Sequence, residues 1–232
     1  MKIISWDIGI INLAYCIMED SKILKWGIID IRESKIKVKK KNVLKIAPIL
    51  INKFHEDPDL IDIDYVIIEN QPCMKNPSMK SIQMILYTAY LMNKETKSCK
   101  TSRIKDIILI SASNKLKVYD GPLIVLDYKS SYTIRKKKAV LHARYFLENK
   151  SELNKCDENK KWIDFFNNNK KKDDLSDTYL QGLYFITNLK KYKITHVIPV
   201  TPVIPVIPVI PVIPVIHVTT DMPPPMQINE NP

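Results

Sequence analysis

Two acidic residues lie in apolar, strand-like runs, where a buried carboxylate needs a partner. Asp7 lies in the run IISWDI, and Glu69 closes the run YVIIE. Because side chains alternate along a strand, Asp7 shares a face with Ile3 and Ser5. An isolated buried charge is strongly disfavoured, so these positions indicate a bound cation. If the two strand ends are adjacent, both acids can bind the same cation. The alternative is that each acid ends its strand, with Asp7 bonding the turn around Gly9.

A further acidic segment, DDLSD, opens the last expected helix. Residues three apart on a helix point the same way, so Asp174 and Asp177 can converge on one ion. Asp173 and Asp177, four apart, also share a face, and spacing therefore does not choose between Asp173 and Asp174. The alternative role for these acids is local, because acids near a helix N-terminus cap the helix and interact favourably with its dipole.

These acids form a donor set of oxygens alone, without His or Cys. Such a set suits a hard cation, namely Mg²⁺ with Mn²⁺ as its substitute. Two such ions about 3.5–4 Å apart can activate a water and stabilise the leaving oxygen in phosphodiester cleavage. The acids therefore predict metal-dependent hydrolysis of a phosphodiester.

The net charge of the chain is strongly positive. Lys and Arg number 36 against 25 Asp and Glu, which gives +11, and neither Lys nor Arg follows Lys193. This surplus favours a polyanion, either nucleic acid or an anionic membrane surface, although a lysine-rich surface from a compositionally biased genome is the alternative. A basic cluster at the start of a helix is the strongest candidate for phosphate contacts. The residues expected to contact nucleic acid are Lys129, Tyr132, Arg135, Lys136, Lys137 and Lys138. Among them, Tyr132 is expected to meet unpaired bases.

Hydrophobic periodicity predicts the elements that would position these side chains. Strands are expected at residues 3–8, 13–18, 23–31, 65–69 and 107–112, with a short extra strand at 123–127. Helices are expected at residues 39–55, 78–92, 134–147 and 174–189. Three meandering strands followed by alternating helices and strands predict an α/β protein with a mixed sheet and helices on both faces. Gly182 would let the last helix lie close against that sheet.

The chain changes character at His196. Val-Ile-Pro triplets, with one Val-Thr-Pro variant, place a proline at every third position from Pro199 to Pro214. This spacing excludes an α-helix, including a membrane-spanning one, and favours a polyproline II rod. We therefore expect a folded domain at residues 1–195 and a proline-rich extension, disordered or polyproline II, at residues 196–232.

Cysteine usage and the first residues favour a cytoplasmic or nuclear protein that is neither secreted nor membrane-bound. The four cysteines form no CxxC pair, which argues against a zinc ribbon, and scattered thiols indicate a reducing compartment. A strand-like run begins at Ile3, which leaves no room for a signal peptide.

Several segments resemble motifs of the RuvC-like Holliday junction resolvases, in the order that this family has them. DIGIINLAYC resembles their first motif, and IIENQP resembles the second-strand motif. SYTIRKKKAVLHARYFL is similar to the basic helix of the poxvirus type, and KKDDLSDTYLQGLYF to the terminal Asp-x-x-Asp helix. The resemblance spans roughly residues 3–190 and extends to the fungal mitochondrial branch. Three features depart from the family pattern: no N-terminal SAP-like module of the fungal branch is expected, the proline-rich extension has no counterpart in the family, and residues 114–128 are hard to place.

The resemblance implies an RNase H-like fold with a mixed five-stranded sheet. It implies metal ligands at Asp7, Glu69, Asp174 and Asp177, which selects Asp174 over Asp173. It further implies a homodimer that cuts opposed strands of a four-way DNA junction, leaves 5′-phosphates and acts in recombination, repair or viral genome replication at a cytoplasmic replication site.

Other hypotheses remain open at this point. A nuclease of the same fold could act on RNA or on transposon-type DNA ends, and a non-catalytic nucleic-acid-binding protein would have purely structural acids. An actin-like sugar kinase also opens on DxG. The isolated glycines Gly9, Gly27, Gly121 and Gly182 argue against it, because that class needs further glycine-rich phosphate loops.

Overall fold

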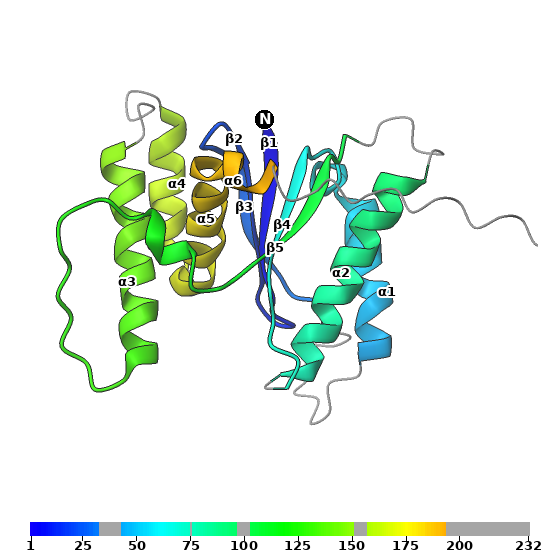
Figure 1. The fold of residues 1–232 in the computed structure, drawn as a ribbon, viewed down its shortest axis with the longest axis horizontal. Helices are drawn as coiled ribbons and strands as arrows, with labels where there is room; N and C mark the ends of the chain where they lie inside the picture. Colours follow the sequence, from blue (N-terminus) through cyan, green and yellow to red (C-terminus); the bar gives the residue numbers. More distant parts are fainter. Residues whose placement is uncertain (33–42, 75, 97–102, 151–156, 194–232) are drawn as a thin grey trace, which may run out of the picture. The chain divides into compact units, whose positions relative to one another are not determined.

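A mixed five-stranded sheet lies between two layers of helices (Figure 1). The computed structural model describes residues 1–32, 43–74, 76–96, 103–150 and 157–193. The strands are β1 Lys2–Asp7, β2 Leu13–Glu19, β3 Lys22–Ile29, β4 Tyr65–Glu69 and β5 Asp106–Ile110. Their order is β3-β2-β1-β4-β5; β1, β2 and β3 pair antiparallel, whereas β4 is parallel to both β1 and β5. The predicted mixed sheet with helices on both faces is confirmed.

The helices divide between the two faces of the sheet (Figure 1). The α-helices are α1 Val43–Glu56, α2 Pro77–Glu95, α3 Ser131–Tyr145, α4 Asp157–Asn168, α5 Lys172–Thr187 and α6 Leu189–Lys193. The shorter turns are η1 Pro58–Leu60, η2 Lys115–Val118 and the π-helical η3 Phe146–Lys150. The α1 and α2 helices cover one face, whereas α3, α4 and α5 lie on the other side (Figure 1). None of the helices in the described ranges is long and apolar enough to cross a membrane.

Alternating side chains of β1 enter two separate hydrophobic cores, as strand parity predicts. Ile4 and Trp6 pack towards α1 and α2, whereas Ile3 packs towards α5. The buried Trp6 indole donates to Tyr90 Oη at 3.0 Å, and the Tyr90 hydroxyl donates to the Leu60 carbonyl oxygen at 2.8 Å. These bonds satisfy the polar atoms of two large core side chains, which fixes β1 against α2.

The α5 helix lies directly against β1 and β2 because Gly182 has no side chain. A Cβ built at Gly182 would collide with Met18 Cε and lie 3.5 Å from Ile3 Cδ1 and Ser5 Cβ. One residue earlier, the buried Gln181 side chain donates to Ser5 Oγ at 3.0 Å and to the Trp6 carbonyl oxygen at 3.2 Å. The close approach expected at Gly182 is therefore confirmed, and it holds α5 in register with the strand that ends at Asp7.

We expect Gly182→Leu to destabilise the protein by about 1–3 kcal/mol, because extra atoms in a filled core force side chains or the helix to shift. Leu favours a helix more than Gly does, so a loss of stability in this variant would result from steric conflict and not from helix propensity. Gly182→Ala is the matched control, since the flexible end of Met18 can move away from a single methyl group. Urea unfolding measures both variants. A Gly182→Leu protein as stable as wild type would contradict the packing described here.

The extra strand expected at residues 123–127 is wrong. The structure has no strand there, and Figure 1 shows this segment running beside α3, away from the sheet. Leu123 and Val125 are 89% and 82% exposed, so the apolar run is neither buried nor paired with a neighbouring strand. A strand needs a hydrogen-bonding partner along its edge, which sequence periodicity does not reveal.

Other expectations differ from the structure mainly at element ends. The basic helix begins at Ser131, earlier than expected, because Ser130 Oγ accepts a capping hydrogen bond from the Thr133 backbone N–H. The α4 helix was not predicted at all; its Phe166 ring stacks on Trp26 with centroids 5.5 Å apart. The first residues of the helix expected at 39–55 and the whole extension 196–232 lie outside the described residues.

Candidate metal centre

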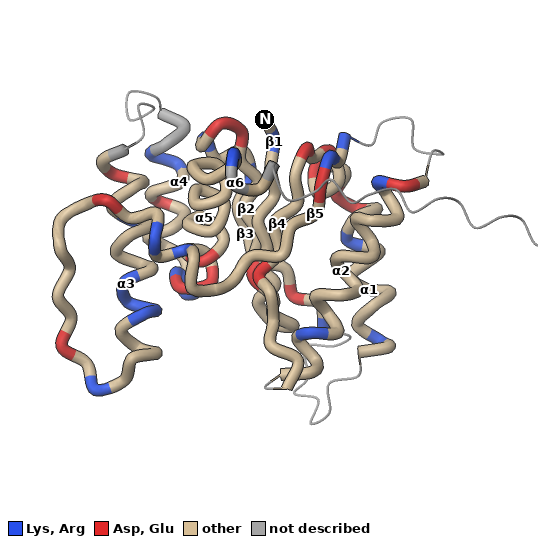
Figure 2. Tube along the Cα trace, in the orientation of Figure 1, with Lys and Arg blue, Asp and Glu red and all other residues tan. Residues whose placement is uncertain are grey.

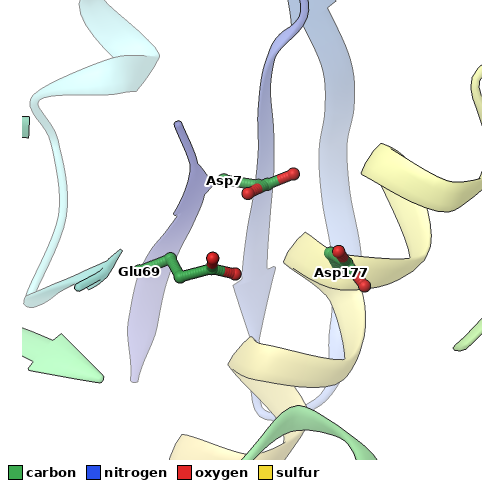
Figure 3. A group of neighbouring side chains, drawn as sticks. All are labelled: Asp7, Glu69 and Asp177. Atoms are coloured by element: carbon green, nitrogen blue, oxygen red, sulfur yellow. The ribbon is translucent and has the colours of Figure 1, made fainter. Parts of the chain in front are cut away.

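Carboxylates from three different elements meet beside the end of β1 (Figure 3). Asp7 ends β1, Glu69 ends β4, and Asp177 projects from α5. One oxygen of each lies within 4.8 Å of the others. The strands β1 and β4 are parallel, and Trp6 lies opposite Ile68. The next residues along the two strands, Asp7 and Glu69, therefore lie side by side at the same edge of the sheet. Three of the four side chains expected to converge therefore do so.

The fourth expected ligand, Asp174, lies next to this group. It lines the same cavity of about 420 Å³ as Asp7, Glu69 and Asp177 but is not one of the three mutually close carboxylates. Lys171 Nζ lies 3.8 Å from Asp174 Oδ2. The alternative residue, Asp173, accepts a hydrogen bond from Lys136 Nζ at 2.5 Å and does not line this cavity. Asp174, and not Asp173, therefore borders the cavity that the three converging acids line.

Burial and the charges of neighbouring acids disfavour the ionised forms of Asp7, Asp174 and Asp177. Burial raises the pKa of Asp7 well above its usual range, and the charges of Glu69 and Asp177 raise it further. Burial also raises the pKa of Asp177 to about 6, although Lys115 opposes this shift. The pKa of Asp174 is raised by burial and by the charge of Asp173. A divalent cation would relieve both effects, so the donor set fits Mg²⁺ or Mn²⁺.

Lys115, which sequence analysis did not single out, contacts two of these acids. It opens the turn η2, and its Nζ lies 2.8 Å from Glu69 Oε2 and 2.5 Å from Asp177 Oδ2. Burial lowers the pKa of Lys115, but the charges of Asp177 and Glu69 more than offset this, so the net shift is upward. The sheet topology could have indicated this position. The turn η2 follows β5, and the end of β5 lies at the same sheet edge as the ends of β1 and β4.

Glu69 is held from a second direction by Gln71, of the IIENQP segment. Gln71 Nε2 donates to Glu69 Oε1 at 3.2 Å. The backbone N–H of Gln71 in turn donates to Gln83 Oε1 at 2.7 Å. Gln83 is fully buried in α2, so this chain of bonds ties the Glu69 carboxylate to the helical layer on the other face of the sheet.

The expected nucleic-acid contacts gather on α3, which carries several basic positions (Figure 2). Tyr132, Arg135 and Lys136 line the acidic cavity itself. Lys136 and Lys137 line an adjoining cavity of about 350 Å³ together with Lys170 and Lys172. The two cavities therefore share Tyr132 and Lys136, which joins the acids to a basic surface.

Two residues of the expected basic cluster lie apart from these cavities. Lys129 is exposed in the loop before α3 and lines neither cavity. Lys138 is half-buried and also lines neither; its charge adds to burial in lowering the pKa of His142 to about 4. Their contact with nucleic acid stays a prediction.

Comparison with known proteins gives no matching family model. An uncharacterized protein of Acanthamoeba polyphaga mimivirus is 33% identical over 141 residues, which cover 59% of this chain. The chain spans only about a third of the length of that relative, 32%.

Solved structures with a similar fold include Holliday junction resolvases. RuvC of Thermus thermophilus, in complex with a Holliday junction substrate, aligns with a TM-score of 0.50 at 10% identity, covering 82% of this chain and 96% of RuvC. This chain has a RuvC-like fold. The yeast mitochondrial resolvase Ydc2 aligns with a TM-score of 0.49 at 17% identity, covering 82% of each chain. The fowlpox virus resolvase, in complex with junction DNA, gives 0.44 at 21% identity, covering 82% of this chain and 99% of the resolvase.

The RuvC-like fold confirms the RNase H-like architecture expected from the motifs. In this fold the acids at the ends of β1 and β4 face α5, which explains why residues far apart in the sequence form one group. At 10% sequence identity the likeness concerns the fold.

The raised pKa of Asp177 predicts a pH dependence of stability in the metal-free protein. The folded state binds a proton more tightly than the unfolded state does, so stability falls as pH rises from about 4 to about 6. Asp177→Asn removes this titration, and the wild type should lose up to about 3 kcal/mol relative to the variant across that window. Urea unfolding in EDTA at several pH values measures the difference. A flat difference, or one of opposite slope, would contradict the burial of this carboxylate.

Proposed function

We propose that this protein is a metal-dependent endonuclease that resolves four-way (Holliday) junctions and other branched DNA. The observation that carries the proposal is the meeting of Asp7, Glu69 and Asp177 at one edge of a RuvC-like sheet. Acid groups alone are common on protein surfaces. Here they come from three separate elements, are largely buried and adjoin a basic helix, which is an arrangement suited to phosphodiester chemistry.

In this proposal Asp7, Glu69 and Asp177 hold divalent ions, and Asp174 completes the set from the preceding turn of α5. Mg²⁺ is the expected metal, with two ions bound and Mn²⁺ as its substitute, because carboxylate oxygens prefer hard cations. When bound, the metal supplies a nucleophile at neutral pH and stabilises the charge of the leaving oxygen. Gln71 positions the Glu69 carboxylate, and Gln181 fixes α5 against β1 next to Asp7.

The chain's own contribution to DNA binding would come from α3 and the residues before it. Phosphates are expected at Lys129, Arg135, Lys136, Lys137 and Lys138, and Tyr132 offers a ring for an unpaired base near the crossover. Phosphate contacts position the DNA without reading its sequence. Junction selectivity would then follow from the shape of the branched substrate.

We further propose that residues 1–195 form the nuclease domain and act as a homodimer. A four-way junction has two-fold related strands, so two identical subunits can present two cutting sites to opposed strands. Products would carry 5′-phosphates and 3′-hydroxyls, as the resemblance implies. The mimivirus relative and the poxvirus-like motifs support a role in viral genome processing, in the cytoplasm or the nucleus.

The test is incubation of the full chain with a labelled synthetic four-way junction, with and without Mg²⁺. We expect paired nicks, symmetric about the crossover, that require the metal. Matched duplex DNA and a structured RNA serve as control substrates. Random degradation of the duplex, or preferential cleavage of the RNA, would contradict junction resolution. Binding of the junction without cleavage in Mg²⁺ or Mn²⁺ would favour a non-catalytic nucleic-acid-binding protein.

A further inference from the structure

We propose that Lys115 is an internal counter-cation that occupies the metal-binding position in the metal-free protein and must leave when the metal binds. The inference rests on the proposed metal site. It adds that the site is occupied by the chain itself before metal arrives, and that displacing this ammonium group weakens the protein's affinity for divalent ions.

The ammonium group lies between two of the three converging carboxylates. Nζ is 2.8 Å from Glu69 Oε2 and 2.5 Å from Asp177 Oδ2, both within hydrogen-bonding distance. Mg²⁺ binds carboxylate oxygens at about 2.0–2.1 Å, so an ion shared by these acids would fall within a few ångströms of the ammonium. Two cations that close repel each other. Lys115 and the metal therefore compete for the same acids.

This contact differs from an ordinary surface ion pair in its burial. The side chains of Lys115 and Glu69 are each 13% exposed, and that of Asp177 is 18% exposed. By comparison, the Lys25–Asp59 pair is exposed by 35% and 62%. Buried, charge-assisted hydrogen bonds are much stronger than exposed ones, so the acids do not release Lys115 without a competing cation.

The local structure also leaves room for the Lys115 side chain to move. It lines the open cavity that Tyr132, Arg135 and Lys136 border, and its four-carbon stem can change rotamer without moving η2. The turn itself is anchored by backbone hydrogen bonds from Asn114 to Ser111 and from Lys117 to Asn114, each 3.0 Å long. A fixed turn with a movable ammonium group is what displacement requires.

The test is Mn²⁺ binding by the full-length chain without DNA, measured by electron paramagnetic resonance of the free ion at neutral pH. Lys115→Met keeps the apolar stem and removes the charge. We expect it to bind Mn²⁺ about tenfold or more tightly, because the wild type must break two charge-assisted hydrogen bonds first. Lys117→Met is the matched control, since Lys117 is exposed on the same turn and contacts Asn114 Oδ1 at 2.8 Å; its Mn²⁺ affinity should equal that of wild type.

Lys115→Gln serves as a second variant if Lys115→Met does not fold, and it should also bind Mn²⁺ more tightly. The same titration of Asp7→Asn distinguishes failure of the counter-cation inference from failure of the proposed metal site. If Asp7→Asn weakens Mn²⁺ binding but the Lys115 variants bind no more tightly than wild type, the metal site stands and the counter-cation is overturned. If Mn²⁺ binding is the same with and without Asp7, or if neither wild type nor the Lys115 variants bind Mn²⁺, both inferences are overturned.

Discussion

Replacing Asp7 with Asn should lower the rate of junction cleavage by roughly a thousandfold while leaving junction binding nearly unchanged, because a metal ion contributes several kcal/mol to the transition state. Asp7 is the central acid: the charges of Glu69, Asp177 and Asp174 all act on it. Asn keeps the shape of the side chain but is a weaker ligand for a hard cation. Since burial disfavours the ionised form of Asp7, Asn should not destabilise the metal-free protein.

Single-turnover cleavage of a labelled junction and a gel-shift titration in EDTA separate the two effects of this substitution. Asp59→Asn is the matched control, because Asp59 is 62% exposed and pairs only with Lys25 among the ion pairs described. It should cleave at the wild-type rate. Undiminished cleavage by Asp7→Asn would remove this acid from the reaction, and lost binding would assign it a structural role.

The double variant Arg135→Gln, Lys137→Gln should bind junction DNA roughly sixtyfold more weakly at 0.1 M salt, since each lost phosphate contact lowers affinity roughly eightfold there. Arg135 borders the acidic cavity, and Lys137 borders the adjoining basic one. Lys136 is left unchanged because its ammonium donates to Asp173, so that its loss would also leave a carboxylate unpaired. The slope of log affinity against log salt concentration should fall by roughly 2.

A control with the same loss of charge comes from the opposite face of the sheet. Lys45 and Lys53 both lie on α1, in the helical layer away from α3 (Figure 2). The Lys53–Glu56 ion pair is exposed, so its loss leaves no buried carboxylate unpaired. Lys45→Gln, Lys53→Gln should leave affinity and salt slope close to wild type. Fluorescence anisotropy at several salt concentrations measures both double variants. Equal weakening in the two would indicate that net charge alone, and not the surface of α3, attracts the DNA.

Much of the site follows from strand parity and topology, and could therefore be predicted from the sequence. Asp7 and Glu69 lie on the face that parity assigns, and the parallel pairing of β1 and β4 then brings them together. Helical spacing alone could not choose between Asp173 and Asp174. The choice follows from packing, because Asp173 turns to Lys136 on the neighbouring helix, while Asp174 borders the acidic cavity.

The parts that sequence analysis missed depend on contacts between distant segments. Lys115 lies in a short 3₁₀ turn without periodicity, and only the tertiary position of β5 shows that its side chain reaches Glu69 and Asp177. The unpredicted α4 helix is stabilised by aromatic contacts with Trp26 of β3. The wrong strand at residues 123–127 has the composition of a strand but no neighbour to pair with.

The central claim is that carboxylates from β1, β4 and α5 bind one group of divalent ions. Anomalous diffraction from crystals of the protein grown with Mn²⁺ tests it most directly. We predict a peak at bonding distance from oxygens of Asp7 and at least one of Glu69 and Asp177, with Lys115 Nζ turned away. Bound Mn²⁺ found only elsewhere, or these three carboxylates too far apart to share an ion, would contradict the claim.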